Sequence, residues 1–302
     1  MTTLEEPPSF EAKITPVPLE SPDFEAEVVT AIEAQLGAPC LGHDSEGFLY
    51  ESLFHLWAVE RQSTSSRKEA CGSAADQPAW YANALGYWDA CEPTVEGMLG
   101  GFGVLDPIDI KGSTAFLHKI WKLRPECGRE ICVDCGGGIG RVTKHLLLPL
   151  FEKVHLLEQS PPLIAVAPEY LGAENAARTS LLCVGMQAFV PEANTYDVVW
   201  SQWVIGHLSD GDLVAFLHRC KRALKPGGVI CLKDNMFPSE KVPKNKGGGN
   251  KHFCVDREDS SMTRSEKYFE ACFKVAGLTI LKKERQGNFP EELYPVVMYA
   301  LV

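Results

Sequence analysis

Residues 131–141 read ICVDCGGGIGR, and this stretch decides the fold of the chain. Its first half is a short apolar run that predicts a buried strand ending at Asp134. Glycines at positions 136, 138 and 140 then allow a sharp turn and close approach of a ligand to the backbone. Apolar residues 146–148 indicate that a helix follows. The stretch therefore predicts a strand, a glycine loop and a helix that together bind a nucleotide-like ligand.

A second acidic residue follows at the spacing that such a site needs. Residues 154–157 predict another strand, and Glu158 ends it in a position to accept hydrogen bonds from ribose hydroxyls. A dinucleotide loop usually reads G-x-G-x-x-G, whereas this loop reads G-x-G-x-G. An acidic residue at the loop entrance also suits the positive sulfonium and amino groups of S-adenosylmethionine. The loop favours a methyltransferase over a dinucleotide enzyme, with a plain tight turn as the remaining alternative.

Composition narrows the class of protein. The 302 residues, 45% of them hydrophobic, suffice for one large domain and an extension. A net charge of -11 argues against nucleic acid or an anionic membrane as a partner and suits a basic peptide substrate. The 11 cysteines lack metal-ligand spacing, so we expect reduced thiols and no metal site. With neither a targeting segment nor a membrane-spanning run, we expect a cytoplasmic or nuclear protein, or both.

The first part of the chain differs from the rest. Residues 1–22 are acidic and proline-rich, which predicts disorder. Phe24, Val28, Ile32 and Leu36 recur every fourth position and predict an amphipathic helix, and a second apolar segment spans residues 48–59. Packing of these segments on the main domain is favoured over packing on a partner, because most amphipathic helices cover a core.

Residues 80–103 are rich in aromatic residues and glycine, a composition that predicts neither helix nor strand. The favoured interpretation is an ordinary loop with an aromatic anchor, and the alternative is a mobile segment that closes over a site.

Strand and helix patterns alternate through the remaining chain. Further strands are predicted at residues 181–184, 196–200, 229–232, 278–281 and 296–301, and a helix at 213–224. Thr263 and Glu266 form a capping-box pattern for another helix, which Gly277 terminates. The alternation predicts a mostly parallel sheet with helices on both faces, and such sheets bind ligands beyond the carboxyl ends of their strands.

Several blocks resemble the protein N-terminal methyltransferases, which methylate the α-amine of proteins beginning X-Pro-Lys or X-Pro-Arg. They read YW (87–88), GMLGG (97–101), DCGGGIGR (134–141), QWVIGHL (202–208), KDN (233–235) and DSS (259–261). The resemblance runs from about Trp80 to the C-terminus. It implies a class I methyltransferase fold, which is a Rossmann-like, seven-stranded and mostly parallel sheet with an antiparallel last strand. The methyltransferase domain would span residues 79–302, after a partly disordered extension, 1–78, with amphipathic helices.

The resemblance also implies roles for individual residues. S-adenosylmethionine would be bound by Gly136, Gly138, Arg141, Glu158, Gln159, Ser160, Met186, Gln187 and Gln202. The peptide channel would be lined by Tyr87, Trp88, Leu99, Trp203, Asn235, Asp256, Asp259, Ser261 and Tyr294. Within that channel Trp203 and Leu99 would grip the proline ring, Asn235 would orient the amine, and Asp256 with Asp259 would receive the basic third residue.

The α-amine must lose a proton before it can attack, because it is mostly protonated at neutral pH. His207 and Asp259 are the predicted catalytic residues, with the carboxylate orienting the imidazole so that the two share the departing proton.

One further departure from the family and two alternative functions remain. Residues 237–254 resemble a lysine- and glycine-rich insertion, for which a flexible surface excursion is favoured over a loop that moves the acidic residues of the channel. A methyltransferase of a small-molecule amine or other acceptor, and a cofactor-binding relative without turnover, are the other functions. The aromatic, Asn and Asp blocks favour the protein α-amine.

Overall fold

The computed structural model describes residues 22–36, 40–62, 79–241 and 250–302. Most of the segment predicted to be disordered, residues 1–21, lies outside this part of the chain, as does the centre of the predicted insertion, residues 242–249. Among the described residues, no helix combines the length and apolarity that crossing a bilayer requires.

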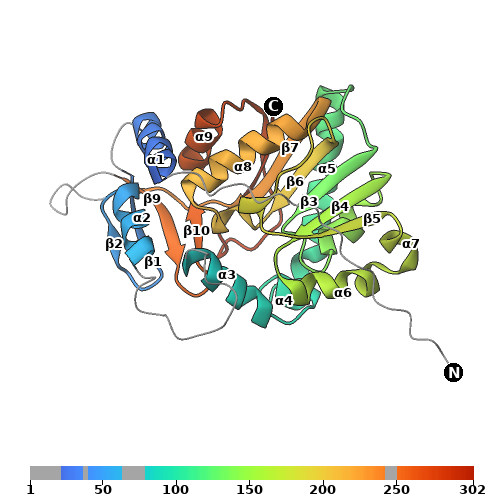
Figure 1. Ribbon diagram of the computed structural model, residues 1–302, viewed down its shortest axis with the longest axis horizontal. Coiled ribbons are helices and arrows are strands. Elements are labelled where there is room, and N and C mark those ends of the chain that lie inside the picture. Colours follow the sequence, from blue (N-terminus) through green and yellow to red (C-terminus); the bar gives the residue numbers. More distant parts are fainter. Residues whose placement is uncertain (1–21, 37–39, 63–78, 242–249) are drawn as a thin grey trace.

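A seven-stranded sheet forms the centre of the molecule (Figure 1). Its spatial order is β11 (Ile280–Arg285), β12 (Val296–Leu301), β7 (Leu224–Asn235), β6 (Tyr196–Gln202), β3 (Ile131–Cys135), β4 (Lys153–Glu158) and β5 (Thr179–Cys183). Strands β7 to β5 are parallel, and β12 is antiparallel to both of its neighbours. The predicted sheet and its antiparallel last strand are therefore confirmed. Chain order reverses between β3 and β6, the point where such sheets bind ligands.

Helices cover both faces of this sheet because its strands alternate two sets of apolar side chains. On one face Val199 and Ile230 pack with α8 (Asp210–Ala223) and α9 (Glu266–Val275). On the other face Trp200 and Cys231 pack with α5 (Asp106–Leu123). Shorter helical elements complete the main body: α6 (Pro161–Leu171), α7 (Ala173–Ala176), η2 (Gly103–Leu105), η3 (Thr143–Leu147), η4 (Met186–Ala188) and η5 (Ile205–His207).

The N-terminal part contributes two helices and a second sheet. Helix α1 (Pro22–Leu36) packs on α8 and α9 through Val28 and Ile32, which confirms the predicted amphipathic helix and its packing on the main domain (Figure 1). The second sheet has the order β10 (Ser261–Arg264), β9 (Asn250–Asp256), β1 (Leu41–Asp44) and β2 (Leu49–Tyr50), with β8 (Glu240–Lys241) also paired to β9. Helix α2 (Leu53–Gln62) follows β2.

The pairing of β1 with β9 is parallel and joins residues about two hundred positions apart in the chain. The flanks of the predicted insertion are thus strands rather than a surface excursion, because β9 gains partners on both sides. The prediction of a loop excursion is wrong for these described flanks.

Two other local predictions are wrong. Residues 80–103 contain α3 (Ala79–Ala90) and α4 (Val95–Met98), because Trp80 and Tyr81 bury their rings and so stabilise a helix despite Gly86. Thr263 lies in β10, and Ser265 instead caps α9 by accepting a hydrogen bond from the Tyr268 N–H (3.3 Å). Pairing with β9 extends β10 past the predicted helix start.

A buried carboxylate joins the N-terminal helices to the main domain. Asp210 Oδ2 accepts hydrogen bonds from Trp57 Nε1 (2.8 Å) and the Tyr268 hydroxyl (2.7 Å), and Oδ1 accepts from Arg264 (3.0 Å). Beside it, Glu25 of α1 accepts from the Ser209 hydroxyl (2.7 Å) and the Gly211 N–H (3.1 Å) at the start of α8. Burial and the charge of Asp210 raise the pKa of Glu25 from 4.5 to about 7.

This raised pKa predicts a pH-dependent stability. Glu25 is protonated more easily in the folded state than in the unfolded state. The stability that this protonation contributes is therefore complete below pH 4.5 and is lost as pH rises to about 7. Glu25→Gln should therefore unfold like the wild type near pH 4 and be more stable by about 1 to 3 kcal/mol at pH 8. Urea unfolding across this range checks it, with Glu27→Gln, on the exposed side of α1, as the matched control. A difference between Glu25→Gln and wild type that stays constant with pH would contradict the assignment.

Candidate active site

The glycine loop after β3 forms the floor of a pocket at the carboxyl edge of the parallel strands. Gly136, Gly138 and Gly140 all have positive φ angles, +69°, +55° and +90°, which L-residues adopt only with strain. A Cβ at Gly136 would collide with Val204, and one at Gly138 would approach Met98 Sδ to 2.7 Å. The loop is therefore shaped so that ligand and neighbouring side chains approach the bare backbone.

The pocket has about 900 Å³ of empty space and is lined from several strand ends. All predicted cofactor residues except Ser160 line it. Of the other predicted site residues, Trp88, Trp203 and His207 line it as well. Asp134, the acidic residue at the loop entrance, lines it too. Residues that the sequence did not single out for this role complete the wall: Tyr81, Met98, Gly137, Val142, Leu157, Leu163, Val184, Gly185, Val204 and Leu208.

Glu158 ends β4 and supports the loop. Its Oε2 accepts a hydrogen bond from the Gly138 N–H (2.9 Å), and its Oε1 accepts from the Ser160 N–H (2.8 Å). Each carboxylate oxygen keeps a second lone pair that a ligand hydroxyl can use. Burial raises the pKa of Glu158, although these backbone N–H groups oppose the shift. Ser160 lies behind the pocket, where its hydroxyl donates to Asp89 of α3 (2.7 Å).

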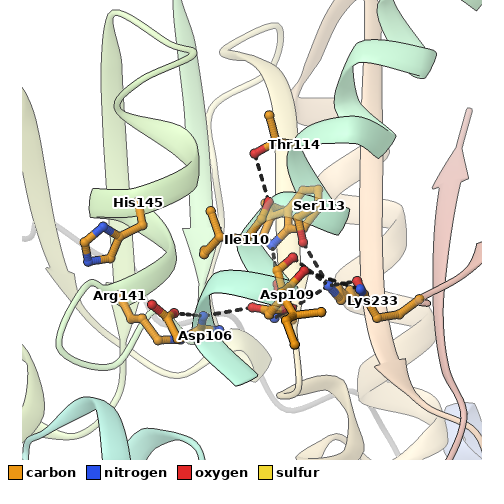
Figure 2. Close-up of polar contacts among 12 residues, drawn as sticks. Asp106, Asp109, Ile110, Ser113, Thr114, Arg141, His145 and Lys233 are labelled. Carbon is orange, nitrogen blue, oxygen red and sulfur yellow. Dashed lines mark hydrogen bonds and ion pairs between the residues drawn. The ribbon is translucent and has the colours of Figure 1, made fainter. Parts of the chain in front are cut away.

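A buried ionic network adjoins the pocket and holds two of its lining residues, Arg141 and Gln202. Figure 2 shows its ion pairs. Asp109, on the first turn of α5, accepts hydrogen bonds from Arg141 (2.8 Å) and from Lys233. Gln202 Nε2 donates to both of its carboxylate oxygens, Oδ1 (2.9 Å) and Oδ2 (2.8 Å). Arg141 also donates to Asp106 (2.6 Å). Burial would raise the pKa of Asp109, but the two cations lower it overall, so it stays ionised.

This network was not predicted from the sequence. Acidic residues in a first helical turn are ordinary, so Asp106 and Asp109 gave no distinctive pattern. Lys233 carried a better signal, since a lysine inside the apolar residues of β7 needs a buried partner. Both cations of the network face the ring of Trp203, with Arg141 Cζ 5.7 Å and Lys233 Nζ 5.9 Å from its centroid.

Helix α3 closes the pocket through two indoles. Trp80 Nε1 donates to the His207 carbonyl (2.6 Å), and Trp88 Nε1 donates to His207 Nε2 (3.0 Å). The other ring nitrogen, His207 Nδ1, lies 3.2 Å from the Ser260 carbonyl and so carries the proton in this arrangement. A backbone carbonyl, rather than the predicted carboxylate of Asp259, accepts the hydrogen bond that orients this imidazole. Burial lowers the pKa of His207, which keeps it neutral, and the nearby charge of Asp259 opposes the shift.

The turn that joins β9 to β10 contacts His207 through the Ser260 carbonyl and carries Asp256, Glu258 and Asp259; we call residues 256–260 the acidic turn. Burial raises the pKa of Asp259, and the neighbouring His207 acts in the opposite direction. Asp259 Oδ1 and Trp203 Nε1 are buried without a hydrogen-bond partner among the described residues. Trp203 has a positive φ of 53° and stacks on Phe289, 6.4 Å between ring centroids.

The remaining predicted peptide residues surround this region without lining the pocket. Tyr87 lies on α3 near the acidic turn. Burial raises its pKa, and the nearby charges of Asp259 and Asp256 raise it further. Leu99 caps α4. Asn235 ends β7, Ser261 begins β10, and Tyr294 is 40% exposed and contacts Phe237.

Comparison with known proteins agrees with this geometry. A family model described as AdoMet dependent proline di-methyltransferase matches residues 76–302. The mouse N-terminal Xaa-Pro-Lys N-methyltransferase 1 is 42% identical over 227 residues, 75% of this chain and 96% of the mouse protein. The Arabidopsis thaliana alpha N-terminal protein methyltransferase 1 is 38% identical over 268 residues, 86% of this chain and 90% of that protein.

A solved structure matches as well. A SAM-dependent methyltransferase of Leishmania major is 33% identical with a TM-score of 0.74, covering 87% of this chain and 96% of that one. The predicted fold class, enzyme class and cofactor, S-adenosylmethionine, are thereby confirmed. With the family model matching three quarters of its length, the chain belongs to the S-adenosylmethionine-dependent proline dimethyltransferases.

Proposed function

We propose that the chain methylates the α-amino group of proteins with an exposed X-Pro-Lys or X-Pro-Arg N-terminus. The observation that carries the proposal is the position of Trp203 and His207, which line the cofactor pocket while His207 contacts the acidic turn. A substrate amine at the pocket would thus have an aromatic wall on one side and carboxylates on the other. The relatives named as N-terminal Xaa-Pro-Lys N-methyltransferases support this choice.

The residues of the pocket fit the cofactor. The glycine loop leaves bare backbone, Glu158 presents buried acceptors for ribose hydroxyls, and Met186 with Gln187 lies at the end of β5 where an adenine would be flanked. When bound, S-adenosylmethionine supplies an electrophilic methyl group on a positive sulfonium. The chain's own part is to hold the acceptor nitrogen in line with that methyl.

The peptide would lie between Trp203 and the acidic turn. Trp203 would pack its ring against the proline, and its indole N–H, which has no hydrogen-bond partner among the described residues, would donate to a peptide carbonyl. The carboxylates of Asp256 and Asp259 would form charge-assisted hydrogen bonds with a basic third residue. Asn235, at the end of β7, would orient the terminal amine.

Asp259 and His207 would together remove the proton from the amine, and Asp259 would be the main acceptor. The His207 Nε2 lone pair already accepts from Trp88, so the imidazole can take a proton only if that bond is released. Asp259 Oδ1 has no such partner among the described residues and is the more available acceptor. If the imidazole takes the proton, the carboxylate of Asp259 beside it stabilises the imidazolium.

We also propose a cytoplasmic or nuclear location, or both, and a protein substrate rather than nucleic acid or membrane. The net charge of -11 supports the choice of partner, since a basic N-terminus is attracted to it and polyanions are repelled. Fluorescence microscopy of the tagged full chain tests the location.

The first expected outcome concerns the substrate. A Pro-Pro-Lys peptide should gain labelled methyl groups on its α-amine, and a matched Pro-Pro-Glu peptide should gain none, since its third residue meets like charges in a confined channel. Tandem mass spectrometry locates the label. Equal turnover of both peptides, or labelling only of small-molecule amines, would remove the proposed substrate.

The second concerns the cofactor. Glu158→Ala should weaken S-adenosylmethionine binding by about 10 to 100-fold, because it removes charge-assisted hydrogen bonds and the support of the Gly138 N–H. Isothermal titration calorimetry measures the dissociation constant, and Glu152→Ala, at the amino end of β4, is the control. Unchanged affinity in Glu158→Ala would show that this carboxylate does not hold the ribose.

The third concerns proton removal. Asp259→Asn and His207→Phe should each lower kcat by roughly 10² to 10⁴, and the double variant should be little worse than either, because the two residues act as a unit. The wild-type rate should rise toward the pKa of the amine, about 7.7 to 8.0, while the variants need higher pH. Near-normal kcat in both variants at neutral pH, with intact circular dichroism, would mean that the amine loses its proton to water.

A further inference from the structure

The acidic turn contains a cation of its own. Arg257 lies between Asp256 and Glu258, two residues before Asp259, so its guanidinium is within reach of the same carboxylates that would bind a basic substrate. An arginine that folded back onto them would neutralise the turn and occupy its acceptors. Where this side chain goes therefore decides whether the turn can bind a substrate cation.

Every nitrogen of this guanidinium is bonded to the N-terminal part of the chain. Arg257 Nε donates to Asp44 Oδ2 (2.7 Å), one terminal nitrogen lies 3.0 Å from Glu60 Oε1, and the other donates to the Tyr50 hydroxyl (2.9 Å). Tyr50 in turn donates to Glu60 (3.1 Å). Asp44 lies on β1, Tyr50 on β2 and Glu60 on α2, which stand beside β9 at the same end of the molecule (Figure 1).

The two carboxylates are built to hold a cation. Asp44 and Glu60 are 2% and 8% exposed, so their charges would be costly without Arg257. Burial alone would raise the pKa of Asp44, but the hydrogen bonds from Arg257 and from backbone N–H groups lower it overall. The backbone is held as well, because the Arg257 N–H donates to Ser45 Oγ (3.2 Å).

We propose that Asp44 and Glu60 sequester Arg257, which leaves the carboxylates of the acidic turn free for the basic third residue of the substrate. These two residues lie before the stretch that the family model matches, residues 76–302, whereas Arg257 lies inside it. The N-terminal part would thus set substrate affinity without touching the substrate. The inference rests on the proposed function and deepens it.

The test measures KM for a Pro-Pro-Lys peptide and for a Pro-Pro-Gln peptide with the full chain. Asp44→Asn with Glu60→Gln should raise KM for the lysine peptide about tenfold, the scale of one charge-assisted hydrogen bond, with kcat and S-adenosylmethionine affinity unchanged. KM for the glutamine peptide should change little. Adding Arg257→Gln should return KM for the lysine peptide to within about threefold of wild type, because the freed cation is gone.

The rescue separates this role from simple support of the turn. If Asp44 and Glu60 only braced the structure, removing Arg257 would worsen the double variant, and both peptides would lose affinity alike; either result overturns the proposal. An unchanged KM in the double variant overturns it too. Glu130→Gln, which breaks an exposed ion pair with Lys225 at the amino ends of the strands, is the control and should keep the wild-type KM.

Failure of the proposed function would look different. In that case the wild-type chain turns over neither peptide, a result obtained before any variant is compared, and the inference falls with it. Circular dichroism and cofactor binding of each variant show that the pocket is intact when KM is compared.

Discussion

The carboxylate of Asp109 is the interaction on which the active site depends. It is completely buried, and it joins α5 to the glycine loop through Arg141, to the end of β6 through Gln202 and to β7 through Lys233. Two buried cations rely on it, and an unpaired charge in such a place costs several kcal/mol. Because Trp203 lies over both cations, the network also fixes the aromatic wall of the pocket. One buried ionic network therefore holds the glycine loop, Trp203 and the ends of β6 and β7 in place.

Much of this architecture could be predicted from local sequence. The strands that carry the site are runs of residues typical of buried strands, and the glycine loop with Glu158 marks the cofactor end of the sheet. What escaped prediction is non-local. Helix α3 forms because Trp80 and Trp88 find hydrogen-bond partners more than a hundred residues away, which outweighs a glycine-rich composition. Asp109 looked like an ordinary helix-start residue, and its importance appears only when Lys233 and Arg141 are brought beside it. The residues of β1, LGHD, show no strand pattern and become a strand by pairing with β9.

The N-terminal part is joined to the enzyme by buried polar groups as well as by apolar packing. Asp210 collects hydrogen bonds from Trp57 of α2 and from Arg264 and Tyr268, while Glu25 of α1 reaches the start of α8. Ser209 and Asp210, which make these contacts, follow His207 closely in the chain. A part of the sequence outside the family match thus contacts both the start of α8, which follows His207 in the chain, and Arg257 of the acidic turn. The alignment with the Arabidopsis protein, which spans 86% of this chain, also reaches into this part.

The parallel pairing of β1 with β9 has a consequence for biosynthesis. Residues 41–44 leave the ribosome long before residues 250–256, and strands β3 to β7 are all made in between. The seven-stranded sheet can therefore begin to form while β1 still lacks its neighbour, and the acidic turn is completed only near the end of translation. Such long-range closure is slow, and an early strand edge that waits for its partner is exposed to association with other chains. Nascent chains of this enzyme should accordingly depend on chaperones that shield the N-terminal strand until the last fifth of the sequence has emerged.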